Sequence, residues 1–192
     1  MIASLQQPLT IEEYLEWEKA QELRHEYLDG EIYAMTGGSK AHNAIAINLA
    51  RELSTHLRTS SCNVFVSDVK VQSAAQGPVF YPDLLVTCDE RDNQAGYVVE
   101  HPCLIVEILS PSTERFDRGA KFRQYRSLAA LQEYVLIGTQ EMSVECFRRS
   151  AEVGVWSFQP YSPGDAVRFE SIGLELPVDI LYEKVLLEPG SN

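Results

Sequence analysis

The sequence lacks any apolar stretch of the roughly 18 residues that a membrane-spanning helix needs. Its first residues also lack a charged segment followed by an apolar one, so no secretion signal is predicted. Cysteine is scarce, and no CxxC pair occurs. Each cysteine lies in or beside an apolar run, which is typical of buried, reduced thiols. We therefore expect a cytoplasmic protein without a membrane span, and with four free cysteines: Cys62, Cys88, Cys103 and Cys146.

Several catalytic motifs are also missing. The chain contains no glycine-rich dinucleotide fingerprint, no Walker loop and no GxSxG nucleophile motif. Its histidines show no HExxH or other zinc-ligand spacing. The hydroxyls of Ser110 and Ser112 have no histidine nearby in the sequence. A zinc enzyme, a P-loop enzyme and a serine or cysteine hydrolase are therefore poorly supported.

Positive charge is in short supply. The 28 acidic and 16 basic residues give a net charge of −12. This balance argues against binding nucleic acid across the whole surface, because phosphate recognition is mainly electrostatic. A local basic groove is still possible, since the densest cluster comprises Arg115, Arg118, Lys121, Arg123 and Arg126. The alternative is the solvated face of an amphipathic helix.

What is present is an ordinary globular composition, with 45% apolar residues in a chain of 192. We expect residues 1–192 to form a single domain of mixed α/β or α+β class. A capping box at Thr10–Glu13 opens a helix that reaches about Ala20. Asp29-Gly30 between β-prone runs predicts a hairpin. Ser39 caps a long helix that ends near Leu57.

The rest of the chain alternates β-type segments with one helix. Residues 103–109 and much of 79–87 are nearly continuous apolar runs, as in central strands that are covered on both faces. The later strands are expected to form a closing antiparallel set. The predicted strands are 63–72, 79–87, 103–109, 133–138, 143–149 and 153–160, with a helix at 114–127 and a short element at 176–185.

Asp83 and Glu107 interrupt the two apolar strand segments. A buried carboxylate is costly unless it is paired or bound to a metal. Two of them on neighbouring strands would repel each other and attract a divalent cation. The alternative for either residue is a strand-end position that reaches solvent or pairs with an arginine. Pro82 cannot donate to a sheet ladder, so it marks an edge, a strand start or a bulge beside Asp83.

Three further residues could belong to the same site. Lys121 shares a helix face with Asp117, so it either extends over the two carboxylates or forms an ion pair on a solvated face. Glu26 precedes the hairpin turn and is either a third carboxylate of the site or a surface residue. His42 lies on the apolar face of its helix, where we expect a core histidine whose ring is hydrogen-bonded.

These segments together resemble a known family. Glu26–Ile32, Tyr81-Pro82-Asp83, Val106–Thr113, Asp117–Tyr125 and Glu133-Tyr134 occur in that order. They are similar to the bacterial restriction endonuclease-like family of the PD-(D/E)XK nuclease superfamily, over about Leu9 to Val185. The resemblance implies a mixed central sheet flanked by helices, with an N-terminal β-hairpin.

The resemblance also implies site residues. Pro82-Asp83 and Glu107 match the superfamily motif, but the usual lysine two positions later falls at Leu109. Lys121 matches a lysine that has moved to the following helix, and Glu26 matches the glutamate before the hairpin. Asp83, Glu107 and the Ile108 carbonyl would hold Mg²⁺ or Mn²⁺.

The implied activity is metal-dependent hydrolysis of DNA phosphodiester bonds. Lys121 would orient the attacking water, and the Arg115–Arg126 cluster would meet the DNA backbone. A homodimer is expected, because duplex cleavage usually needs two active sites. The alternative is a catalytically inactive member of the same fold that binds nucleic acid or another protein. The acidic charge and the leucine at position 109 favour this alternative.

Overall fold

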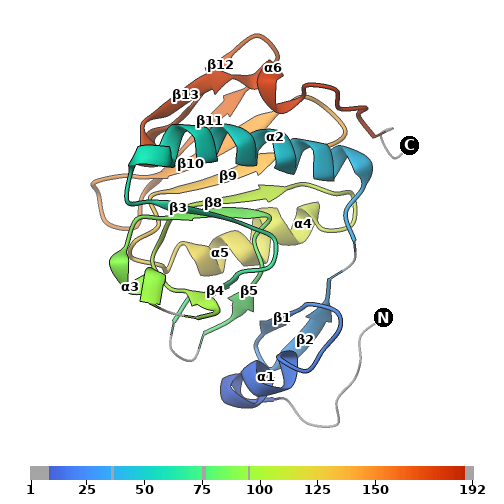
Figure 1. The fold of residues 1–192 in the computed structure, drawn as a ribbon, viewed down its shortest axis with the longest axis vertical. Helices are drawn as coiled ribbons and strands as arrows, with labels where there is room; N and C mark the ends of the chain where they lie inside the picture. Colours follow the sequence, from blue (N-terminus) through green and yellow to red (C-terminus); the bar gives the residue numbers. More distant parts are fainter. Residues whose placement is uncertain (1–8, 36, 75–76, 95, 189–192) are drawn as a thin grey trace.

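The computed structural model describes residues 9–35, 37–74, 77–94 and 96–188, and these form three sheets with helices around them (Figure 1). The sheets contain six, five and two strands. The mixed α+β architecture expected from the sequence is confirmed. None of the helices in these residues is both long and apolar enough to cross a membrane.

The six-stranded sheet forms the centre of the molecule. Its strands β8 and β9 run parallel, and its other neighbours are antiparallel. Parallel neighbours need a long crossover, which the intervening helix supplies. Strands β9, β10 and β11 form the antiparallel set that the sequence predicted. In spatial order the sheet contains β11 (Trp156–Tyr161), β10 (Val144–Arg149), β9 (Glu133–Ile137), β8 (Pro102–Ile108), β6 (Leu84–Thr87) and β3 (Asn63–Val66).

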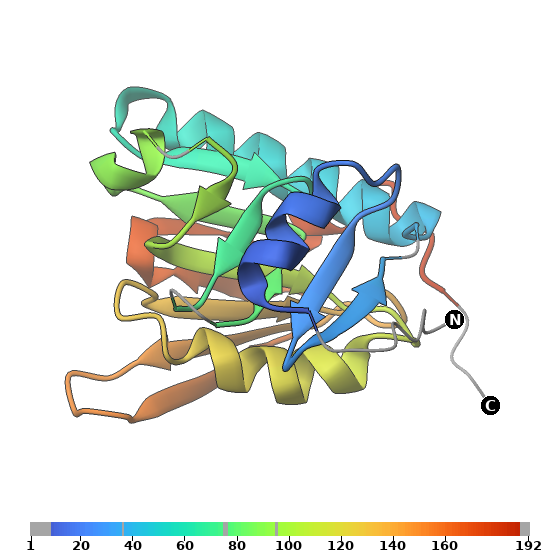
Figure 2. The same ribbon diagram turned by 90° about the horizontal axis from the view of Figure 1, so that it is seen from below.

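Helices cover both faces of this sheet (Figure 2). On one face α2 (Lys40–His56) packs Ile45, Leu49 and Leu53 against apolar strand residues. On the other face lies a helix in three parts, α4 (Glu114–Phe116), the π-helical turn η2 (Asp117–Lys121) and α5 (Phe122–Tyr125). The central strands are therefore buried on both sides, which explains their unbroken apolar sequence.

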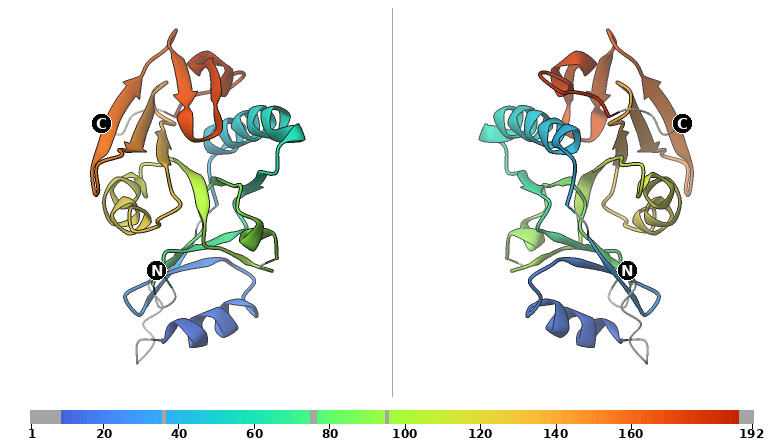
Figure 3. Two further views of the ribbon diagram at one scale, coloured as in Figure 1. Left: turned by 90° about the vertical axis from the view of Figure 1, so that its left-hand side faces the viewer. Right: turned by 90° about the vertical axis from the view of Figure 1, so that its right-hand side faces the viewer.

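A second sheet and α1 (Ile11–Glu18) form one end of the molecule (Figure 3). The predicted capping box is present, with Thr10 and Glu13 bonded reciprocally. The predicted hairpin is also present, and its turn residues Asp29 and Gly30 have positive φ angles of 53° and 86°. The strand order is β2 (Glu31–Ala34), β1 (His25–Leu28), β5 (Val79–Phe80), β4 (Lys70–Gln72) and β7 (Val98–Val99).

Two segments predicted as single strands each divide between the two sheets. Residues 63–72 break after β3, where Ser67 has a φ of 58°, and continue as β4. Residues 79–87 break at Tyr81-Pro82-Asp83, between β5 and β6. The two breaks are adjacent, because the Ser67 amide donates to the Asp83 carbonyl over 2.9 Å. The proline thus lies in the break between two strands, and not at the first residue of a strand.

Several short elements did not follow from the sequence, although the predicted element at 176–185 overlaps two of them. They lie in the loops around the main sheet and in its C-terminal cover. They are η1 (Leu57–Thr59), α3 (Glu90–Gln94), β7 (Val98–Val99), β12 (Ala166–Phe169), η3 (Glu170–Ile172), β13 (Leu174–Pro177) and α6 (Val178–Leu181).

The prediction that all four cysteines are free is wrong for one pair. Cys62 and Cys88 form a disulfide, while Cys103 and Cys146 are free thiols. The cause is the register of β3 and β6, because Asn63 lies opposite Thr87 and the next residues outward face each other. Their Cα atoms are 4.0 Å apart. The cytoplasmic location, which rested in part on reduced cysteines, stays a prediction.

Candidate active site

A cavity of about 780 Å³ lies between the N-terminal hairpin, the start of α2 and the start of the α4–η2–α5 helix. All five residues that the sequence singled out for the site line it: Glu26, Asp83, Glu107, Ile108 and Lys121. The hairpin supplies the first, the strand break the second, the end of β8 the next two, and the π-helical turn the last. The fold thus gathers at one cavity residues that are up to 95 positions apart in the sequence.

Asp83 is fixed by two hydrogen bonds, both to Oδ2. The Ile108 amide donates to this oxygen over 2.7 Å, and the His42 Nε2 atom lies 3.1 Å from it. The first bond links the strand break directly to the end of β8. Because the N–H and C=O of a strand residue point to the same side, the Ile108 carbonyl also faces the Asp83 side of β8.

Lys121 lies among three carboxylates. Its Nζ atom is 2.9 Å from Glu26 Oε1, 3.1 Å from Glu107 Oε1 and 3.4 Å from Asp117 Oδ1. The side chain is only 7% exposed. Burial alone would lower the pKa of Lys121, but the three negative charges outweigh it and raise this pKa well above its usual value. The ammonium is therefore charged throughout the ordinary pH range.

The two glutamates are buried and are held by further donors. The Tyr81 amide donates to Glu26 Oε1 over 3.1 Å, and the Tyr125 hydroxyl donates to Glu107 Oε1 over 3.2 Å. Burial raises the pKa of both carboxyl groups, and for Glu107 the rise is large. The nearby Lys121 charge opposes the shift in each case. Both carboxylates are thus costly to keep ionised without a cation.

Asp117 is a site residue that the sequence reasoning missed. It was considered only as the partner of Lys121 on a solvated face, yet the structure buries it at the cavity. Its Oδ1 atom makes no hydrogen bond within the described residues, and burial raises the pKa of its carboxyl group. The missing signal was the π-helical turn, because an ideal helix would place Asp117 differently relative to Phe122 and Tyr125.

His42 is not the core histidine that its helical position suggested. It lines the cavity and contacts Asp83 through Nε2. Burial lowers the pKa of His42, but the hydrogen bond and charge of Asp83 outweigh burial and raise it. Gly38 lets the chain before α2 pack closely against the His42 ring, because a Cβ at this position would lie 2.8 Å from His42 Nδ1. The histidine therefore orients the Asp83 carboxylate.

The cavity has the composition of a site for a hard divalent cation. Five carboxylates, Glu26, Asp83, Glu107, Asp117 and Glu188, face the single ammonium of Lys121. Within the described residues, no three acidic, histidine or cysteine side chains already form a metal-binding group. Mg²⁺ commonly needs only one or two carboxylates and completes its shell with water and substrate oxygens. The donor set of Asp83, Glu107 and the Ile108 carbonyl fits such an ion.

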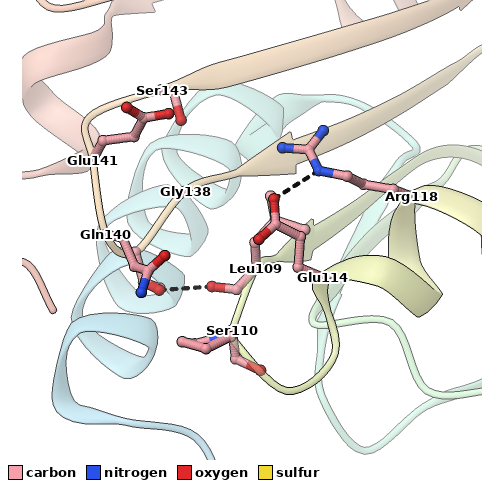
Figure 4. A pocket seen from close by; sticks show the side chains of 10 residues that line it. Leu109, Ser110, Glu114, Arg118, Gly138, Gln140, Glu141 and Ser143 are labelled. Carbon is pink, nitrogen blue, oxygen red and sulfur yellow. Dashed lines mark hydrogen bonds and ion pairs between the residues drawn. The ribbon is translucent and has the colours of Figure 1, made fainter. Parts of the chain in front are cut away.

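A second cavity, of about 370 Å³, adjoins the first and shares Ser110 and Pro111 with it (Figure 4). Its basic side chain, Arg118, is already bonded to Glu114 and Glu145. Arg118 is thus neutralised, whereas Arg115, Arg123 and Arg126 of the predicted basic cluster are exposed on the same helix.

Comparisons with known proteins give the family of this chain. The Uma2 family model, described as "Putative restriction endonuclease", matches residues 11–179. An uncharacterized protein of Synechocystis sp. is 41% identical over 174 residues, which cover 91% of each chain. A second one is 36% identical over 152 residues, 78% of this chain and 85% of the relative.

A solved structure shares the fold. It is described as a "putative nuclease belonging to DUF820" from Anabaena variabilis, and it is 20% identical to this chain with a TM-score of 0.77. The match covers 93% of this chain and 100% of the other.

Proposed function

Since the chain belongs to the Uma2 family of restriction endonuclease-like proteins, we propose that it is a Mg²⁺- or Mn²⁺-dependent DNA endonuclease. The observation that carries this proposal is the acidic cavity in which Asp83, Glu107 and the Ile108 backbone adjoin a buried lysine. A cavity wall with five carboxylates repels a phosphodiester unless a cation lies between them. The proposed activity therefore requires a metal.

The strand residues of the cavity would hold the cation. Asp83 and Glu107 offer carboxylate oxygens, and Ile108 offers its carbonyl. Bound there, the cation would lower the pKa of a water molecule and neutralise charge that develops on the phosphate. His42 and the Ile108 amide keep Asp83 oriented, so the ligand geometry is set before the substrate arrives.

Lys121 would act on the nucleophile and on the phosphate. The superfamily position for the lysine is Leu109, which is buried and packed in the core beneath the helix. Lys121 reaches Glu107 from that helix instead. Its charge opposes the repulsion between Glu26, Glu107 and Asp117, and one of its protons can be redirected to a water or a phosphate oxygen. Glu26 would hold the ammonium in this position.

The alternative is an inactive member of the fold that binds nucleic acid or a protein. The net charge of −12 and the saturation of Lys121 by three carboxylates favour it. Metal-dependent cleavage separates the two functions, because the alternative predicts none. The homodimer stays a prediction that rests on the need for two sites in duplex cleavage.

Asp83→Asn and Glu107→Gln are each expected to slow cleavage of supercoiled plasmid by more than about 100-fold in Mg²⁺ or Mn²⁺, because each removes a ligand charge. Glu175→Gln is the matched control, since Glu175 is an exposed carboxylate on β13 that pairs with Arg168. Gel assays of nicked and linear products give the rates. Cleavage that survives both site substitutions contradicts the assignment. Failure of the unmodified protein both to cleave and to bind metal favours the alternative.

His42→Gln is expected to slow cleavage by about 10- to 100-fold and to raise the Mn²⁺ concentration needed for half-maximal rate, because it loosens the Asp83 carboxylate. His56→Gln is the control on the same helix. Its ring contacts the Ile172 carbonyl, away from the cavity. An unchanged metal dependence in His42→Gln would show that this histidine does not position Asp83.

A further inference from the structure

Four aromatic rings, one from α5, one from β10 and two from the edge strand β11, contact one another in the order Trp156, Phe122, Phe147 and Phe158. The Phe122 ring centroid lies 4.6 Å from that of Phe147 and 5.5 Å from that of Trp156, and Phe147 lies 5.1 Å from Phe158. Phe147 and Phe158 are opposite each other in the sheet register. Phe158 is 53% exposed. Figure 2 shows β10 and β11 beside the helix that contains α5.

Arginine side chains accompany these rings. The Arg149 guanidinium carbon lies 4.7 Å from the Trp156 ring centroid, and that of Arg126 lies 5.4 Å from the Phe122 centroid. Arg149 also donates to the carbonyls of Arg126, at the end of the helix, and of Leu128 and Leu131, in the loop that follows, and these bonds fix it beneath Trp156. We call this set the aromatic–arginine surface, and it comprises Phe122, Arg126, Phe147, Arg149, Trp156 and Phe158.

The charge of this surface differs from that of the chain as a whole. Within the described residues, Arg123 and Arg126 are exposed and form no ion pair with a carboxylate. The acidic residue two positions before Phe147, Glu145, is already bonded to Arg118. On a chain of net charge −12, these are cations available to an anionic partner.

We propose that the aromatic–arginine surface binds an unpaired stretch of polynucleotide that flanks the bond to be cut. Single strands expose base faces that stack on aromatic side chains, while their phosphates need nearby cations. A duplex keeps its bases stacked internally and offers no face to Trp156 or Phe158. The inference rests on the proposed nuclease function and adds a substrate class to it.

The same helix, α4–η2–α5, contributes residues to both the cavity and the aromatic–arginine surface. Asp117 and Lys121 line the cavity, whereas Phe122 and Arg126 belong to the surface. At about 1.5 Å per residue, Asp117 and Arg126 are separated by roughly 14 Å along the axis. A strand that leaves the cavity along this helix would therefore reach the surface within a few nucleotides.

A second copy of this chain is the other partner to consider. An isologous contact centred here would bring the unpaired arginines of both copies together, which is unfavourable. A polyanion instead has the opposite charge to these arginines and is attracted to them. The charge of the surface thus favours nucleic acid.

Binding of fluorescein-labelled (dT)₁₆ in EDTA, followed by anisotropy, tests the proposal without cleavage. Phe158→Ala and Arg126→Glu are each expected to weaken binding by about tenfold or more. Tyr97→Ala removes another exposed aromatic side chain, and Arg58→Glu makes the same charge change elsewhere, so both controls should bind normally. Equal losses in the variants and their controls would overturn the proposal.

Intrinsic fluorescence gives a second readout. The chain has two tryptophans, so Trp17→Phe leaves Trp156 as the sole tryptophan, and excitation at a wavelength that tyrosine does not absorb reports on it alone. The Trp156 emission should fall when (dT)₁₆ or (rU)₁₆ binds. The oligonucleotide that binds more tightly shows whether the partner is DNA or RNA. Unchanged emission, equal binding of a blunt duplex, or loss of a dimer in Phe158→Ala with normal oligonucleotide binding would each refute the inference.

The two proposals fail separately. If the unmodified protein binds (dT)₁₆ through this surface but cleaves no DNA with metal, the nuclease function fails and the binding surface stands. If plasmid is cleaved and the surface variants bind normally, the binding surface fails and the nuclease function stands.

Discussion

Lys121→Met lowers the free energy of unfolding by about 3–5 kcal/mol at pH 8, the usual cost of removing one partner from a buried ion pair. The expectation follows from the surroundings of the ammonium, which is 7% exposed and contacts three carboxylates. Methionine fills a similar volume but leaves Glu26, Glu107 and Asp117 without their cation. Chemical denaturation measures the change. Lys19→Met, which removes an exposed pair with Glu16, should cost at most about 1 kcal/mol.

The deficit of Lys121→Met should shrink as the pH falls from 8 to 5. The three carboxyl groups already have raised pKa values in the folded protein, and loss of the lysine raises them further. A carboxyl group whose folded pKa exceeds its unfolded pKa favours the folded state when protonated. Its contribution is present below the unfolded pKa and is lost as pH rises through the folded pKa. A deficit that is equal at both pH values would contradict this account of the cavity.

Mn²⁺ or Mg²⁺ stabilises the protein by about 2.7 kcal/mol when the free ion is at 100 times its dissociation constant, if the cavity binds it as proposed. The reason is the charge balance of the cavity, where five carboxylates face one ammonium. Thermal unfolding with increasing metal measures the effect, and it needs no DNA and no turnover.

The same titration on variants locates the ion. Asp83→Asn should lose most of the metal-dependent shift, whereas Glu175→Gln should retain it. A full shift in Asp83→Asn would place the ion elsewhere, even if the protein cleaves DNA. The result therefore tests the ligands separately from the activity.

The sequence predicted those features that depend on neighbouring residues or on simple apolar patterns. Asp83 and Glu107 were recognisable because a carboxylate in an apolar strand is costly. The Asp29-Gly30 hairpin follows from turn chemistry, and α2 from its cap and its apolar face. The main sheet strands and the long helix at 114–127 were also found, although their ends shifted by a few residues.

What could not be predicted depends on contacts between distant segments. The strand breaks at Ser67 and Asp83 arise because two pairs of strands pass from one sheet into another. The disulfide of Cys62 with Cys88 depends on the β3–β6 register, which no local pattern reveals. His42 looked like a core residue because its apolar helix face is real, and only the fold shows that Asp83 lies against it.

The π-helical turn Asp117–Lys121 has a consequence for how sequences of this kind can vary. The extra residue of this turn gives the helix a different rotational phase before and after it. One phase directs side chains toward the carboxylates and the other toward the aromatic core. Deletion of one residue, such as Gly119, would restore a single phase and rotate one side by about 100° relative to the other. Either Asp117 would leave the Lys121 ammonium, or Lys121 and Tyr125 would together leave Glu107. Chain length in this short turn is therefore constrained as strictly as the identity of its lysine, and substitutions are easier to accommodate there than insertions or deletions.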